Sequence, residues 1–298
     1  MCTKYLRPSL LILSVLLACT TAFAQHHDSA TKHPEKIPVF EELLLIDDQT
    51  VFVPQKKSFE IELQQRFGTI TNGMEDLLGI FAPSNTRIGI YYVPAKNLMV
   101  GAGITRKHLV LGLEAKYSLL KQGISPVAVS YFVNGSMDME ENEHVHESSE
   151  RLSWFQQVMF AREFGKCFSL QVAPSLSHFN RIEQSIDETE VYDTSTVNHF
   201  AVSLLAQYRF SHAFSLVGEF DHPLTRHEVG GPLPNISLGV QFVKGAYCFQ
   251  LFAENYYNID AQSSNMFNRN DFSRGQFLIG FNLARTWNFS KKRAAGCH

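Results

Sequence analysis

Residues 59–67 read Phe59-Glu60-Ile61-Glu62-Leu63-Gln64-Gln65-Arg66-Phe67, and this stretch decides the fold class. Apolar and polar side chains alternate along it, with Gln65 as the one exception. Successive side chains of a β-strand point to opposite faces, so an alternation with a period of two residues predicts a strand. The stretch is therefore expected to form a strand with one apolar face and one polar face.

The same alternation returns about twelve times along the chain. Regular runs cover 59–67, 109–119, 200–210, 236–242, 247–253 and 277–283, and less regular runs lie near 85–92, 97–105, 126–134, 152–163, 168–178 and 213–221. A soluble sandwich would turn the polar faces to water, whereas a membrane barrel would turn the apolar faces to lipid and the polar faces to its lumen.

The connections between these runs favour the barrel, because long and short connections alternate. Short links lie near 93–97, 121–125, 164–167, 210–213 and 243–246, and longer ones cover about 69–84, 135–150, 180–196, 222–234 and 257–274. Outer-membrane barrels have short periplasmic turns and long outer loops. The link near 106–108 departs from this rule, since a long loop is expected there and the connection is tight.

The lengths of the runs and the positions of aromatic residues agree with a membrane-spanning sheet. A tilted strand needs about 9–11 residues to cross the bilayer, and aromatic girdles mark both interfaces. Aromatic pairs such as Tyr91-Tyr92 and Tyr256-Tyr257 stand at run ends. We therefore predict an all-β, antiparallel transmembrane β-barrel of about twelve strands over residues 58–290, with a polar tail at 291–298.

The N-terminus has the pattern of an export signal. Lys4 and Arg7 precede an apolar stretch, and Ala22-Phe23-Ala24 provides a small-x-small cleavage site. We expect residues 1–24 to be a signal peptide and the barrel to reach the bacterial outer membrane, with lipoprotein processing at Cys19 as the alternative. Residues 25–57 are then expected to form a segment that lies in the periplasm or fills the lumen as a plug.

Composition narrows the classes of function. The chain has 298 residues, with 26 Lys and Arg against 29 Asp and Glu, which argues against a nucleic-acid partner. Cys167, Cys248 and Cys297 would remain after signal removal, and their wide spacing indicates neither a zinc site nor a disulfide framework, although one bridge is compatible with it. No phosphate-binding Gly loop or dinucleotide fingerprint is present, so no cofactor is expected.

Several motifs resemble those of a known family when they are taken together. They are Gln65-Arg66-Phe67-Gly68, Gly79-Ile80-Phe81-Ala82-Pro83-Ser84-Asn85, Ser169-Leu170-Gln171-Val172-Ala173-Pro174-Ser175 with His178 and Asn180, and Gly280-Phe281-Asn282-Leu283-Ala284-Arg285. In this order the chain resembles a family of bacterial membrane-bound β-barrel domains of unknown function, from about residue 58 to 289. The resemblance implies a barrel in the outer membrane with outer-membrane lipid around it, and it implies no catalytic residues.

The chain also departs from the family pattern at two places. Gln65 stands where His is expected, and Gly245-Ala246-Tyr247 replaces a Gly-Gly-His turn. Any site that depends on those histidines is therefore not expected here.

Charged residues on the polar faces are the first candidates for function. The alternation directs nine of them into the lumen: Glu60, Glu62, Arg66, Arg87, Glu114, Lys116, Arg209, Glu219 and Glu254. Both signs are present, so the charges can pair with one another, and the lumen shows no dominant charge of the kind that selects ions. A narrow pore and a barrel with a salt-bridged plug are both compatible with this pattern.

The acidic loop 136–150 is a second candidate, because it contains His144 and His146 among many carboxylates and no Lys or Arg. Imidazole and carboxylate ligands suit Zn, Cu or Ni, and carboxylates alone suit Ca or Mg. The same composition is typical of a solvated surface loop, which we favour. Divalent cations are therefore expected as partners of this loop only under the alternative reading.

A lipid hydrolase is the alternative from another functional class. His146-Glu147-Ser148 and Ser177-His178 place a nucleophile and a base close together in sequence. Catalysis also needs hydrogen-bond contact, an orienting group and oxyanion donors, and spacing alone provides none of them. The leading prediction is a barrel that is not an enzyme and that forms a small-solute pore or a structural part of the envelope.

Overall fold

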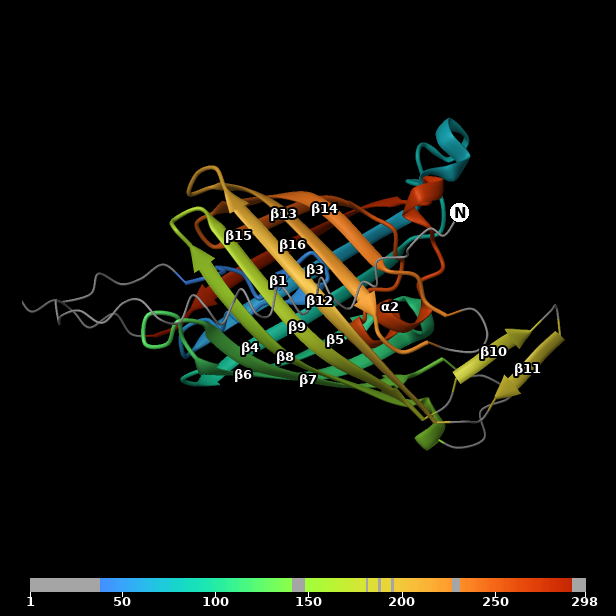
Figure 1. Cartoon of the computed structure of the whole chain (residues 1–298), viewed down its shortest axis with the longest axis horizontal. Coiled ribbons are helices and arrows are strands. Elements are labelled where there is room, and N and C mark those ends of the chain that lie inside the picture. The colour runs from blue at the N-terminus through green and yellow to red at the C-terminus, as the bar shows by residue number, and fades with distance from the viewer. Residues whose placement is uncertain are drawn as a thin grey trace, which may run out of the picture. The chain divides into compact units, whose positions relative to one another are not determined.

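The computed structural model describes residues 38–140, 148–180, 182–186, 189–193, 196–226 and 231–290. Within them, twelve antiparallel strands close into a barrel (Figure 1). These strands are β3 Ser58–Thr69, β4 Asn85–Ala95, β5 Leu98–Thr105, β6 Val110–Leu120, β7 Ala128–Asp138, β8 Leu152–Phe164, β9 Phe168–Phe179, β12 Val197–Arg209, β13 Phe214–Pro223, β14 Asn235–Lys244, β15 Tyr247–Glu254 and β16 Leu278–Asn288. The predicted fold class, a closed antiparallel barrel of about twelve strands, is confirmed.

Each barrel strand pairs with its neighbours in the sequence, and β16 returns to pair with β3. The closing register runs from Asn288 opposite Ser58 to Leu278 opposite Thr69, with one irregularity between Leu278 and Gly280. Closure leaves no barrel strand with an unpaired edge, which a strand in lipid requires because no water can satisfy its backbone.

The two ends of the barrel differ in the length of their connections. One end has the links 96–97, 121–127, 165–167, 210–213 and 245–246, and the other carries the long connections and the tight link 106–109. The remaining elements at the long-loop end are η2 Ile70–Asp76, η3 Lys107–Leu109, η4 Ser148–Arg151, β10 Ile182–Ile186, β11 Thr189–Asp193, α2 Ala261–Phe267 and η5 Phe272–Arg274. The predicted loop 135–150 began too early, because residues 135–138 continue β7 and pair with 110–113 of β6.

The outer wall is apolar and exposed. Leu204 on β12 is 40% exposed and Leu238 on β14 is 61% exposed, while their inward neighbours Leu205 and Gly239 are buried. Exposed leucine and phenylalanine recur around the wall, as expected for side chains that contact lipid. No helix in the described ranges is long and apolar enough to cross a bilayer.

The interior of the barrel is packed with a segment that precedes β3. Residues 38–53, called the plug below, contribute buried apolar side chains to a cluster with the inward-facing wall. The plug side chains in this cluster are Val39, Phe40, Leu43, Leu45, Ile46, Val51 and Val53. The wall contributes Tyr91, Val93, Met99, Ala128, Phe132, Phe155, Met159, Ala161, Ala173, Leu205, Val217 and Phe252.

Candidate functional site

The plug is a small hairpin rather than a straight strand. Its strands β1 Leu44–Leu45 and β2 Asp48–Gln49 pair with each other, and Thr50 N donates to Leu43 O at 2.9 Å. The turn places Ile46 at φ 60°, in the left-handed region. This conformation costs a β-branched residue roughly 1–2 kcal/mol, so contacts with the surrounding wall must offset it.

Two glutamines of the wall bind the plug backbone with both ends of their side-chain amides. Gln250 accepts from Ile46 N at 3.1 Å and donates to Leu44 O at 3.1 Å. Gln171 accepts from Val51 N at 2.9 Å and donates to Gln49 O at 2.7 Å. Each amide thus takes the place of a neighbouring peptide group, and the buried backbone of the hairpin is satisfied without another strand.

Two hydroxyl groups bind the two ends of the plug in the same way. Ser169 Oγ donates to Val39 O at 2.6 Å, and Ser130 Oγ donates to Val51 O at 2.7 Å. The wall therefore contacts the plug backbone along its whole length.

Charged wall residues bind the same backbone at its centre. Lys116 Nζ donates to Leu43 O at 3.1 Å, to Thr50 O at 3.0 Å and to the Gln49 side chain at 2.9 Å. These acceptors use all three donors of the buried ammonium group. Glu219 accepts from the backbone N–H groups of Asp47 and Asp48, at 3.1 and 3.2 Å.

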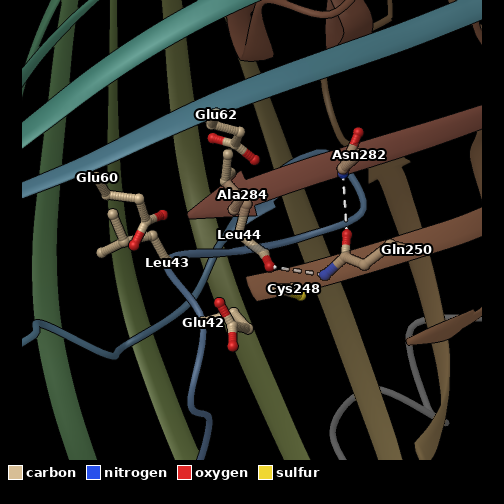
Figure 2. A pocket seen from close by; sticks show the side chains of 9 residues that line it. All are labelled: Glu42, Leu43, Leu44, Glu60, Glu62, Cys248, Gln250, Asn282 and Ala284. Atoms are coloured by element: carbon tan, nitrogen blue, oxygen red, sulfur yellow. Dashed lines mark hydrogen bonds between the residues drawn. The ribbon is translucent and has the colours of Figure 1, made fainter. Parts of the chain in front are cut away.

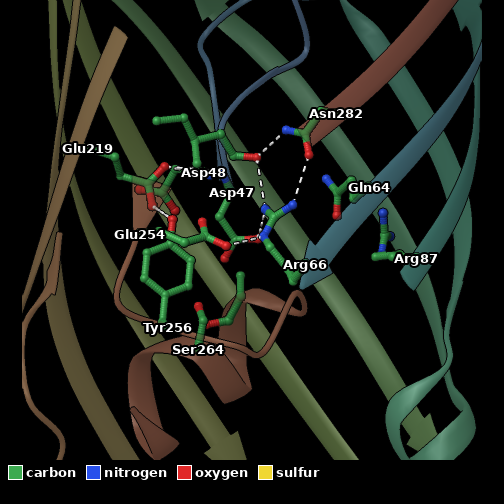
Figure 3. A network of polar contacts seen from close by, with 12 residues as sticks. Asp47, Asp48, Gln64, Arg66, Arg87, Glu219, Glu254, Tyr256, Ser264 and Asn282 are labelled. Carbon is green, nitrogen blue, oxygen red and sulfur yellow. Dashed lines mark hydrogen bonds and ion pairs between the residues drawn. The ribbon is translucent and has the colours of Figure 1, made fainter. Parts of the chain in front are cut away.

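Arg66 joins the plug to two further strands, as Figure 3 shows. Its guanidinium pairs with Glu254 of β15 at 2.5 Å and with Asp47 of the plug at 3.6 Å, and it donates to Asn282 of β16 at 2.9 Å. Asn282 in turn donates to Ile46 O at 2.6 Å. The strained residue of the plug is therefore bound by this network, and a buried network of this kind fixes one arrangement only when its members are satisfied.

A small cavity separates the plug from the wall near the short-turn end (Figure 2). Three carboxylates line it, Glu42 from the plug and Glu60 and Glu62 from β3, together with the Cys248 thiol. Burial, and next to it the charges of Glu60, Glu41 and Glu62, raises the pKa of the Glu42 carboxyl to about 8. The plug thus brings its own acid against two acids of the wall.

The helix α2 packs against β8, β9, β12 and β13 at the long-loop end. Its side chains Gln262, Ser264, Asn265 and Met266 are buried. Phe267 packs against Phe179 of β9 with ring centroids 5.3 Å apart. Within the described part of the chain, the plug and α2 therefore both occupy the lumen.

All nine charged residues that the alternation directs inward lie inside the barrel. Eight are buried and Arg209 is partly buried. Three ion pairs form on the wall: Arg66 with Glu254, Arg87 with Glu114, and Arg209 with Glu163. Whether these residues line a solute path stays a prediction.

The other predicted residues are not assembled into a site. His144 and His146 lie outside the described residues, as does Cys297. Cys167 is exposed and Cys248 is buried, and both are free thiols. The metal-site prediction therefore stays untested.

The Ser177-His178 pair does not have the geometry of a nucleophile and its base. Adjacent strand residues point to opposite faces, and Ser177 is buried inside while His178 faces outward. The His178 ring lies 2.8 and 3.0 Å from the side-chain oxygens of Asn198 and Asn180. His146, the other base in the hydrolase reading, is outside the described residues.

The neutral anchors Gln171, Gln250 and Asn282 are functional residues that the sequence reasoning missed. They stand on polar faces of recognised strands, so their inward direction was available from the alternation. Their role as anchors could not be predicted from the sequence, because the pattern of the wall does not show what fills the lumen.

Comparison with known families and structures agrees with this architecture. A family model described as a membrane bound beta barrel domain (DUF5777) matches residues 40–287, a range that includes most of the plug. Comparison of the sequence with curated proteins finds no match.

Solved structures of membrane barrels are similar to the chain in fold. An outer membrane channel from Pseudomonas putida F1 aligns with a TM-score of 0.51 and 9% identity, covering 79% of this chain and 97% of that one. The NanC porin aligns with a TM-score of 0.47 and 8% identity, covering 76% of this chain and 98% of that one.

Proposed function

Because the chain belongs to the family of membrane bound beta barrel domains, we propose that it is an outer-membrane channel for small solutes whose own plug holds it closed. The observation that carries the proposal is the binding of the plug backbone by wall side chains. The anchors Gln171, Gln250, Lys116 and Asn282 contact main-chain atoms. A segment bound from several sides within the lumen obstructs passage where it lies.

The width of a barrel with twelve strands supports the proposal of a plugged channel. About eight strands are filled by their own side chains, whereas 16–18 strands leave an open channel. The lumen of this barrel is wide enough to hold the plug hairpin, and the plug and α2 occupy this space. Removal of the plug would therefore leave a passage lined by the nine charged residues and by the apolar wall residues that now contact the plug.

The solved structures support a channel in a limited way. The similar structure from Pseudomonas putida F1 is titled an outer membrane channel, at an identity that shows fold alone. A purely structural role in the envelope is the second candidate, and the extent of plug contacts favours it because such contacts resist opening.

Planar-bilayer recording of the refolded chain distinguishes these two functions. The test compares the native chain with a Gln250→Ala, Asn282→Ala double variant, which removes contacts to Leu44 and Ile46. A gated channel predicts rare openings of the native chain and frequent openings of the variant. A structural barrel predicts silence in both, with heat-modifiable gel migration showing that both are folded.

A further inference from the structure

A basic and aromatic group lies on the outer wall at the short-turn end, away from the plug. Arg285 of β16 is exposed, and its inward neighbour Ala284 is buried. The strand carries Leu283 on the same outward face, at 42% exposure. Arg285 is thus a cation on a wall that presents mainly apolar side chains to lipid.

Two aromatic rings hold the Arg285 guanidinium. Its Cζ lies 4.7 Å from the ring centroid of Tyr247 on β15 and 4.5 Å from that of Trp287. Trp287 in turn packs against Phe59 of β3, with ring centroids 5.9 Å apart. Stacking on aromatic faces orients a guanidinium and leaves its N–H donors directed outward along its plane.

These donors have no partner within the described part of the chain. Arg285 forms no hydrogen bond or ion pair through its side chain with any described residue, unlike the inward arginines Arg66 and Arg87. An arginine on the lipid face is destabilising at the bilayer midplane and nearly neutral at the interface, where it can reach headgroups. The position next to the turn 245–246 places it at that interface.

A second cation stands in the same row of the sheet. Tyr247 pairs with Arg285 on one side and with Lys244 of β14 on the other. Neighbouring strands lie about 4.8 Å apart, so the Cα atoms of the two cations are roughly 10 Å apart across Tyr247. This spacing suits one anionic group that both long side chains can reach.

We infer that Lys244, Tyr247, Arg285 and Trp287 form a binding site for the phosphate of a glycerophospholipid headgroup. Arg285 would bind two phosphate oxygens with its planar N–H fork, and Lys244 would add a point charge. The rings of Tyr247 and Trp287 would lie at headgroup level, where aromatic side chains are favoured. The adjacent apolar wall would hold the acyl chains.

The chain offers a fluorescent probe at the site, since it contains two tryptophans, Trp154 and Trp287. In a Trp154→Phe variant of the full chain, Trp287 emission reports on this site alone. The protein is held in an uncharged detergent and titrated with bromine-labelled phosphatidylglycerol, which quenches tryptophan on contact. Bromine-labelled diacylglycerol, which lacks the phosphate, is the comparison lipid.

The matched control is Arg162 on β8, which is outward-facing near the same end and stacks on one ring, Phe164, at 5.4 Å. We expect Arg285→Ala to raise the lipid concentration for half-quenching about tenfold, the effect of losing one charge-assisted bidentate contact. Arg285→Lys should give an intermediate shift, and Arg162→Ala should change the value less than about twofold.

Three results would overturn the inference. Equal shifts from Arg285→Ala and Arg162→Ala would mean general charge attraction. Equal quenching by diacylglycerol would mean apolar contact with the wall alone. Competition by inorganic phosphate or by lipopolysaccharide at the same concentration as the phospholipid would assign the site to a different phosphate source. Heat-modifiable migration of each variant checks that the barrel is folded.

Discussion

The inner and outer faces of the barrel wall come from the same strands and meet different surroundings. On β12, Leu204 faces outward and is 40% exposed, whereas Leu205 faces inward and is fully buried against the plug cluster. On β16, Leu283 faces outward while Asn282 binds the plug backbone. The outer face is mainly apolar because it meets lipid, and the inner face is mixed because the plug has both apolar side chains and a polar backbone.

The largest loss of folding stability is expected from a substitution at a buried charge on the inner face. Arg66→Ala would leave Glu254 and Asp47 without their cation. Removing one partner of a buried pair costs about 3–5 kcal/mol. Urea unfolding of the barrel in lipid vesicles measures this loss.

A methionine at position 66 provides the control for that prediction. Arg66→Met together with Glu254→Gln and Asp47→Asn removes the cation and both of its acidic partners, and should recover most of the stability. If this triple variant is as unstable as Arg66→Ala, the charge pairing is not the cause of the loss.

On the outer face, the stability lost on introducing a charge is expected to depend on how deep in the bilayer the substituted residue lies. Leu204→Arg, halfway along β12, should destabilise the barrel by about 2–4 kcal/mol, measured by the same unfolding. Phe210→Arg, beyond the end of β12 at the short-turn end, should cost about 0–1 kcal/mol. Equal costs at the two positions would contradict the lipid assignment of this face.

A neutral anchor of the inner face should have a smaller effect. Asn282→Ala removes the donor to Ile46 O and leaves that buried carbonyl with the 3.4 Å contact from Arg66. An unsatisfied buried polar group costs about 1–3 kcal/mol, and here the cost falls on the plugged state. Hydrogen exchange of the plug amides should therefore be faster, while exchange of the strand amides is unchanged.

Sequence alternation predicted the outer face well and the inner face in part. The regular run 59–67 has the inward residues Glu60, Glu62, Gln64 and Arg66, all of them polar. The less regular runs contain the apolar inward residues Met99, Phe132, Phe155 and Met159, which contact the plug. The packing of a hairpin inside the barrel therefore weakened the period-two pattern in these runs. The sequence of a single strand cannot show which partner its inner face meets.

The sequence does not decide whether residues 25–57 lie in the periplasm or fill the lumen, and the composition of the plug explains why. Residues 43–46 read Leu-Leu-Leu-Ile and have no alternation, since they are buried on every side. The hairpin turn has Ile46 and Asp47 instead of the usual Asn-Gly signal, so neither its shape nor its partner is readable locally. The anchors come from residues more than 60 positions away, such as Lys116 and Gln250.

Binding of the plug is also expected to depend on pH. Burial holds the pKa of Glu42 at about 8 in the docked plug, against an ordinary value of 4.5. A raised pKa means that the docked state binds the proton more tightly, so docking is favoured most below pH 4.5 and weakens up to pH 8. Channel openings should become more frequent over this range and level off above it.

Glu42→Gln should remove most of this dependence, because its side chain stays neutral beside Glu60 and Glu62. The measurement is opening frequency in a planar bilayer at constant salt. An unchanged pH profile in the variant would show that other acids, such as Asp47, control the response.

The most direct test of the account is the conductance of the barrel with and without its plug. A variant that lacks residues 38–53 is refolded beside the native chain, and gel migration before and after heating shows that both barrels are closed. The account predicts steady open steps for the deletion variant and a mostly closed native chain. Equal conductance of the two folded barrels, or silence of both, would contradict the claim that the plug closes a channel.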